Sequence, residues 1–211
     1  MRMNLKNRKK LKLKFKFMTK KNYFFFLICF FLISIIIGIF FFLYMNSIDK
    51  QQVYESLNNY FTLKDSYNYK TILFSNIKNN LKFGIIMWIL GISVIGIILN
   101  VFLYFGEGFS LGFTISSMFS YYKNKAIVGM FCYLFPTRII FLLILFILTY
   151  NSLKFSYHLI EHLFLKKELD LREKLKSYYK VLIFSLILLF LISILETFLM
   201  PFFIKIFTKL Q

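Results

Sequence analysis

The stretch Tyr23–Met45 is apolar throughout and contains no charged side chain, and comparable runs occupy Phe83–Phe105 and Val181–Phe203. A helix over such a run reaches about 34 Å, which is enough to cross the roughly 30 Å hydrocarbon core of a bilayer. Each Leu, Ile or Phe near the bilayer centre favours insertion by about 0.3–0.6 kcal/mol, so a whole run favours insertion by several kcal/mol. The sequence therefore predicts an all-α, polytopic membrane helical bundle and argues against a water-soluble protein.

The length and charge of the chain bound its organisation. The 211 residues carry a net charge of +18, and 59% of them are hydrophobic. The longest segment outside the apolar runs is residues 46–82, and segments below about 40 residues rarely fold as domains by themselves. We therefore expect a basic cytoplasmic tail, residues 1–22, and one integral membrane domain, residues 23–211. The basic residues flank the apolar runs, so anionic lipids rather than nucleic acid are the expected partners.

The number of spans depends on the segment Phe109–Tyr150, which is interrupted by the polar residues Lys123–Lys125. Residues 126–150 are long enough to cross, whereas residues 109–122 reach only about 21 Å and either cross a thin region or re-enter on one side. The distribution of basic residues favours a crossing by residues 109–122. Such a crossing puts the seven Lys and Arg of residues 151–180 on the same side of the membrane as the ten of residues 1–22.

The predicted topology therefore has five spans, with the N-terminus inside and the C-terminus outside. The spans are residues 23–45, 83–105, 109–122, 126–150 and 181–203. Between them lie an outer loop, residues 46–82, a tight cytoplasmic turn at Glu107, and a cytoplasmic amphipathic segment, residues 151–180.

Small residues recur at helical spacing in the third span. Gly108, Gly112, Ser116 and Ser120 share one stripe of a helix. Small residues let a second helix approach closely, and Gly84 and Gly91 on the second span offer a partner face. The stripe predicts the central packing helix of the bundle, with a substrate path as the alternative.

Two charged side chains fall inside predicted spans, and each is costly in lipid, about 3 kcal/mol for Arg at the centre. Arg138 follows Pro136 in the fourth span, and Glu196 lies in the outer half of the fifth. Opposite charges at compatible depths predict an intramembrane ion pair between Arg138 and Glu196. The alternative interpretation is an ion or proton path.

A possible metal motif lies just beyond the fourth span, where His158, Glu161 and His162 match the pattern H-x-x-E-H. Such short motifs occur often by chance, and we expect polar residues at the membrane interface rather than a metal site. Cys29 and Cys132 lie in apolar runs and are expected to pack as small hydrophobic residues. The sequence shows no Gly-rich phosphate loop and no G-x-S-x-G element, so we expect no catalytic residues and no cofactor.

The outer loop contains several aromatic residues among polar ones. These residues suit either a contact surface for a partner or the aromatic belt at the membrane interface. They are Tyr54, Tyr60, Phe61, Tyr67 and Tyr69.

The segment from Leu81 to Phe203 resembles the stage II sporulation protein M family. The resemblance rests on Trp88-Ile89-Leu90-Gly91, on Gly108-Phe109-Ser110-Leu111-Gly112-Phe113-Thr114 and on the following apolar segment with its Phe135-Pro136 break. It implies a multi-pass protein of the bacterial cell membrane that acts as a non-enzymatic scaffold for engulfment during endospore formation. It also implies stage II sporulation proteins D and P as partners that supply peptidoglycan degradation.

A second function, from a different class, remains open on the residues alone. Short or broken helices and charges within the membrane are also features of permeases. The alternative is therefore a permease-like membrane subunit of an export transporter of the ABC type.

Overall fold

The computed structural model describes residues 20–61, 68–93, 95–133, 137–165 and 171–210, and these residues form helices with no strand among them. The helices are α2 (Lys20–Leu43), α3 (Ser47–Phe61), α4 (Tyr69–Ile92), α5 (Gly96–Tyr122), the short η1 (Lys123–Lys125), α6 (Ala126–Tyr133), α7 (Ile139–Leu165) and α8 (Leu171–Leu210). The predicted all-α fold is confirmed.

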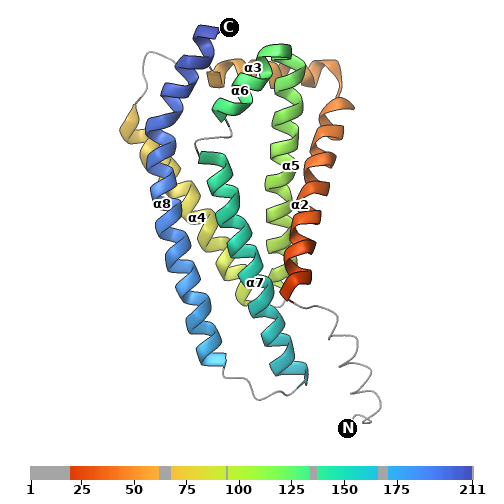
Figure 1. Ribbon diagram of the computed structural model, residues 1–211, viewed down its shortest axis with the longest axis vertical. Helices are drawn as coiled ribbons and strands as arrows, with labels where there is room; N and C mark the ends of the chain where they lie inside the picture. The colour runs from red at the N-terminus through yellow and green to blue at the C-terminus, as the bar shows by residue number, and fades with distance from the viewer. Residues whose placement is uncertain (1–19, 62–67, 94, 134–136, 166–170, 211) are drawn as a thin grey trace.

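Five long helices, α2, α4, α5, α7 and α8, run along the long axis of the molecule (Figure 1). The helix α3 lies across one end of this bundle, which we call the upper end, and the end of α8 reaches the same level. The opposite, lower end holds the joint between α4 and α5, the end of α7 and the start of α8. The described chain therefore enters and leaves the bundle at opposite ends, since α2 runs upward from Lys20.

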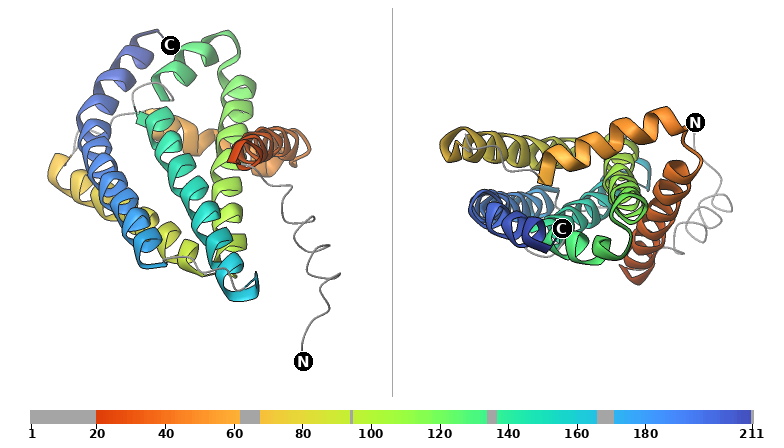
Figure 2. Two further views of the ribbon diagram at one scale, coloured as in Figure 1. Left: turned by 60° about the horizontal axis from the view of Figure 1, so that its bottom comes forward. Right: turned by 90° about the horizontal axis from the view of Figure 1, so that it is seen from above.

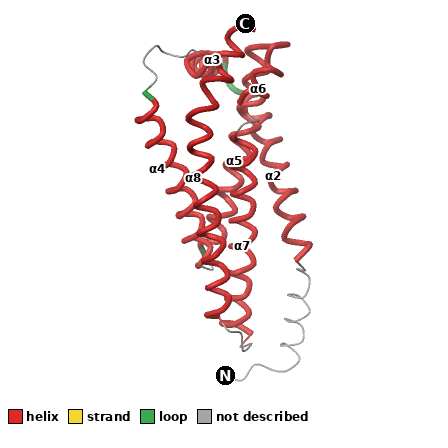
Figure 3. The backbone as a smooth tube through the Cα atoms, turned by 60° about the vertical axis from the view of Figure 1, so that its left-hand side comes forward, coloured by secondary structure: helices red, strands yellow, loops and turns green. Residues whose placement is uncertain are grey.

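The helices form two neighbouring groups. α2 packs chiefly against α5, whereas α4 packs chiefly against α8, and α7 contacts both groups. Seen from above, α2 and α8 lie on opposite sides of the bundle and α3 crosses over its top (Figure 2). The tube in Figure 3 shows the same arrangement from the side, with helix along almost the whole described chain.

Four helical stretches in the described part of the chain are long and apolar enough to cross a membrane: Asn22–Leu43, Gly96–Phe131, Ile139–His162 and Arg172–Phe207. The helix α4 runs beside them, and its first 14 residues include Lys70, Lys78 and Lys82. The chain is thus a helical membrane protein with several apolar helices.

The predicted turn at Glu107 is wrong, because α5 continues without interruption from Gly96 to Tyr122 and contains that residue. The predicted spans 83–105 and 109–122 therefore do not match the helices. α4 ends at Ile92, with Ser93 as its C-cap, and α5 covers the rest of the first span and all of the second. Two glycines cost a helix only about 1 kcal/mol each, whereas unsatisfied backbone groups in lipid cost several kcal/mol each. The helix accordingly passes through Gly106-Glu107-Gly108, and the chain reverses between the end of α4 at Ile92 and the start of α5 at Gly96.

Two other predicted segments also differ from the structure. The outer loop, residues 46–82, is largely helical, because it comprises α3 and the first half of α4. The amphipathic segment, residues 151–180, is not a separate element, because its two parts extend α7 and begin α8. Nearly all of the basic tail, residues 1–22, lies outside the described residues.

The packed centre of the bundle is apolar and joins several helices. Its buried residues are Leu27, Met87, Tyr104, Phe141, Ile144, Leu145, Leu148, Leu189 and Ile192. A second, smaller cluster at the upper end holds Met118 and Ala126 against Ile204 and Phe207 of α8. The polar groups described next are therefore surrounded by packed apolar side chains.

Candidate functional site in the charged centre of the bundle

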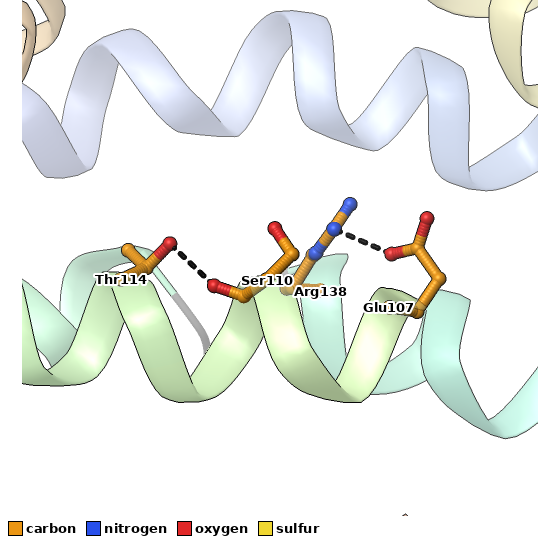
Figure 4. A network of polar contacts seen from close by, with 4 residues as sticks. All are labelled: Glu107, Ser110, Thr114 and Arg138. Atoms are coloured by element: carbon orange, nitrogen blue, oxygen red, sulfur yellow. Dashed lines mark hydrogen bonds and ion pairs between the residues drawn. The ribbon is translucent and has the colours of Figure 1, made fainter. Parts of the chain in front are cut away.

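A partly buried ion pair links α5 to the start of α7. The Nη2 of Arg138 donates a hydrogen bond of 2.6 Å to Oε2 of Glu107, and the two side chains are 26% and 18% exposed (Figure 4). Thr137 and Arg138 form a wide π-type turn just before α7 begins at Ile139. This turn places the guanidinium over the ring of Phe141, 5.1 Å from its centroid, which adds a cation–π contact.

The predicted direct pair between Arg138 and Glu196 is corrected by this geometry. Glu196 instead accepts a hydrogen bond of 3.4 Å from the amide of Asn80, although it remains within electrostatic reach of Arg138. The buried Nε of Arg138 has no hydrogen-bond partner among the described residues. One cation therefore lies between two acids, in contact with the nearer one on α5.

Polar side chains also join α4 to α8 along a ladder. Asn80 donates to Ser193 at 3.0 Å, and Asn76 donates to Thr197 at 3.1 Å. Asn amides on one helix and hydroxyls on another are typical interhelical hydrogen bonds in membranes. The ladder thus joins α4 to α8, and the Arg138–Glu107 pair joins α5 to the start of α7.

The predicted small-residue stripe does pack closely, but its partner is α2 rather than α4. A Cβ added at Gly108 would overlap Ser34 of α2, and one added at Gly112 would overlap the backbone at Ile35. Gly38 of α2 fits in the same way against the backbone of Phe109. The sequence indicates this close packing, because the small residues Ser34 and Gly38 are four residues apart in the first apolar run.

The remaining predicted packing residues lie elsewhere. Gly84 of α4 faces Leu189 of α8, while a side chain at Gly91 would overlap Tyr178 and Ser152. Ser116 is buried, whereas Ser120 bonds to Tyr54 Oη at 2.6 Å. The residues with described contacts thus face α2, α3, α7 or α8 instead of sharing one face.

Of the aromatic residues predicted as a partner surface, two contact other helices of this chain, and the side chains of the others lie outside the described part of the structure. Tyr54 stacks on Tyr121 with ring centroids 4.9 Å apart, and Tyr69 stacks on Phe198 at 5.9 Å. The side chains of Tyr60 and Phe61, and the whole of Tyr67, lie outside the described residues. Tyr54 is therefore an anchor that fixes α3 on α5.

A cavity of about 590 Å³ lies beneath α3, next to that anchor. Its lining mixes polar and apolar side chains of α3 and α5, together with Met45 between α2 and α3. The residues are Met45, Asp49, Gln52, Val53, Ser56, Leu57, Phe113, Thr114, Ser117 and Met118. α3 thus rests on the bundle through part of one face and leaves its opposite face, which includes Glu55, exposed.

The H-x-x-E-H motif lies on the lower part of α7. His158 Nδ1 is 3.7 Å from Oε2 of Glu161, which is buried. Among the described residues, no three His, Cys, Asp or Glu side chains come together as a metal site would require.

Comparison with known proteins identifies the family. The family model for stage II sporulation protein M matches residues 27–201, which include the charged centre and nearly all of the bundle. No curated protein and no solved structure matches the chain significantly. With a match over most of its length and several apolar helices able to cross a membrane, the chain belongs to the stage II sporulation protein M family and is a sporulation-related membrane protein.

Proposed function

We propose that this protein is a non-enzymatic membrane scaffold that anchors a peptidoglycan-degrading complex during engulfment in endospore formation. Its partners are stage II sporulation proteins D and P, which carry the hydrolytic chemistry. The observation that carries the proposal is the family match over residues 27–201.

The interior of the bundle supports a fixed anchor. The Arg138–Glu107 pair and the Asn80–Ser193 contact join helices at defined positions. Polar ties of this kind, surrounded by apolar packing, restrict sliding and rotation of the helices. A complex assembled on such a bundle would be held in a constant geometry relative to the membrane.

The proposed orientation places α3 outside the cell. The ten Lys and Arg of residues 1–22 favour a cytoplasmic N-terminus, and α2 then brings α3 to the outer face. Peptidoglycan lies on that side of a bacterial membrane. The exposed residues Gln51, Glu55 and Asn58 share one face of α3, away from the bundle, and form the proposed docking face for the partners.

Co-purification tests the scaffold. The full chain, tagged and extracted in mild detergent from sporulating cells, should retain proteins D and P. Changing Glu55 and Asn58 together to Lys should reduce their recovery at least several-fold, because it reverses charge on the docking face. The matched control is Lys176→Glu at the lower end, which should leave recovery unchanged.

Two results would overturn this function. One is the absence of both partners from the unchanged chain under conditions in which it remains folded. The other is hydrolysis of peptidoglycan by the purified chain alone at a useful rate.

The second candidate is a permease-like subunit of an export transporter of the ABC type. The buried charges Arg138, Glu107 and Glu196 favour it, since intramembrane charges often line transport paths. It would require a co-purifying ATPase and nucleotide-dependent flux in vesicles. If the charges serve transport, Glu107→Gln should abolish the flux while the ATPase still co-purifies.

A further inference from the structure

A separate pocket lies at the lower end of the bundle, between the last turns of α7 and the first turns of α8. Its volume is about 250 Å³. The lining residues are Asn151, Lys154, Phe155, His158, Glu173, Lys174, Ser177 and Tyr178. The apolar stretches of these two helices end at His162 and begin at Arg172, so the pocket lies near the boundary of the membrane-crossing region.

Positive charge enters this pocket from both helices. Lys154 comes from α7 and Lys174 from α8, and both act electrostatically on His158 between them. Neither lysine forms an ion pair with a described residue. Glu173 is the one acid among the lining residues, so the two lysines outnumber the acids in the lining. Glu161 lies beside the pocket, 3.7 Å from His158, and adds a second negative charge there.

The floor of the pocket is rigid and aromatic. The rings of Phe155 and Tyr178 stack with centroids 4.8 Å apart and an interplanar angle of 6°. Tyr178 is 3% exposed, and its hydroxyl is bonded to Ser152 at 2.7 Å and to the carbonyl of Trp88 at 2.9 Å. The floor therefore keeps its shape, while Lys154, Lys174 and the Ser177 hydroxyl supply donors at the rim.

This combination suits a phosphate group attached to an apolar body. Ammonium groups and a hydroxyl bind phosphate oxygens, and the aromatic floor accepts apolar glycerol and acyl carbons. Basic pockets between membrane helices near the headgroup level are recognised sites for anionic lipids. A free phosphate ion would use the same donors but would gain nothing from the apolar floor.

We propose that the pocket formed by Lys154, Lys174, Phe155 and Tyr178 binds the phosphate headgroup of an anionic phospholipid. The site is distinct from the charged centre, and it does not depend on the proposed scaffold role. It would hold the lower ends of α7 and α8 together through one lipid molecule.

The test uses the purified full chain in mild detergent, titrated with phosphatidylglycerol, phosphatidylcholine or inorganic phosphate. Retained lipid is counted by native mass spectrometry, and stabilisation is followed as a shift in melting temperature. Phosphatidylglycerol should bind and raise the melting temperature, whereas phosphatidylcholine and inorganic phosphate should do neither. Lys154→Ala and Lys174→Ala should each weaken binding about fivefold, the factor expected for one basic residue near an anionic headgroup.

The matched control is the double variant Lys176→Ala and Lys180→Ala. It removes twice the charge of either pocket variant, from exposed positions of α8 outside the pocket, and should still leave binding within twofold. Glu173→Gln should tighten binding, a gain that damage to the fold does not produce. Equal losses in the pocket and control variants, no gain with Glu173→Gln, or equal binding of inorganic phosphate would overturn the proposal.

Discussion

Arg138 shows how this bundle accommodates a charge that lipid disfavours. Placing Arg at the centre of a membrane helix costs about 3 kcal/mol on the insertion scale. Here Glu107 contacts the guanidinium at 2.6 Å, and Phe141 covers it at 5.1 Å. Glu107 on α5 and Phe141 on α7 therefore supply the compensation, and the ion pair fixes α5 relative to α7.

Removing Arg138 alone should destabilise the protein strongly. Arg138→Met leaves the partly buried Glu107 carboxylate without its cation. Breaking a fully buried ion pair typically costs about 3–5 kcal/mol, and this partly exposed pair should cost less. The melting temperature in detergent and the amount of protein accumulated in membranes should both fall. Adding Glu107→Gln should restore most of both quantities, because it removes the unpaired charge.

The matched comparison is Arg138→Met combined with Glu196→Gln. Because Glu196 bonds to Asn80 and is not in contact with Arg138, this second combination should restore less. Equal restoration by the two combinations would show that the cation is shared evenly between the acids.

At the scale of elements, α5 depends on close approach to α2. Gly112 meets the backbone at Ile35, and Gly38 meets the backbone of α5, so neither position accommodates a side chain without separating the helices. This contact, together with the rings of Phe41 and Phe109 at 5.4 Å, is the main attachment of α2 to the bundle.

Gly112→Ala should therefore lower stability, by about 1–3 kcal/mol, the usual cost of overpacking. Gly106→Ala is the control on the same helix, since nothing lies within 4 Å of an added Cβ there. That variant should raise stability by up to about 1 kcal/mol, because Ala favours helix over Gly. Thermal unfolding in one detergent compares both, and a loss of similar size at both positions would contradict the α2–α5 packing.

The sequence predicts much of the element list and misplaces the boundaries for identifiable reasons. Apolar runs locate α2 and much of α8, whereas the predicted span 126–150 covers α6 and only the first part of α7. The pattern Gly106-Glu107-Gly108 indicates a turn in soluble proteins, yet here it lies within a helix because lipid penalises broken backbone hydrogen bonds. A turn at Glu107 would place its carboxylate outside the spans, which leaves Glu196 as the acid predicted to pair with Arg138.

The sequence also does not specify which helices pack against one another. The stripe through Gly108 and Gly112 was recognisable at helical spacing, but spacing does not specify which helix approaches it. The sequence predicts a loop over the first part of α4, up to residue 82, because Lys70, Lys78 and Lys82 lower the hydropathy there. Its amides instead bond to α8, and such partners are defined only by the assembled bundle.

At the scale of the whole molecule, the two ends of the bundle differ in chemistry. The upper end carries α3 with its cavity and anchor at Tyr54, while the lower end carries the basic pocket between α7 and α8. A protein with different chemistry at its two ends needs one fixed orientation in the membrane. The ten basic residues within 1–22 are the strongest signal for that orientation.

Cysteine labelling measures this orientation directly. In a background with Cys29→Ser and Cys132→Ser, single cysteines replace Glu55 on α3 or Lys176 on α8, both of which are exposed. A membrane-impermeant maleimide should label the Glu55→Cys variant in intact cells, and the Lys176→Cys variant only after permeabilisation. The reason is that basic flanking segments stay in the cytoplasm, and α2 carries the chain once across before α3 begins. The reverse pattern would place α3 inside the cell and would remove the basis for docking cell-wall hydrolases on it. Labelling of both cysteines in intact, sealed cells would show that the two ends of the bundle do not lie on opposite sides of the membrane.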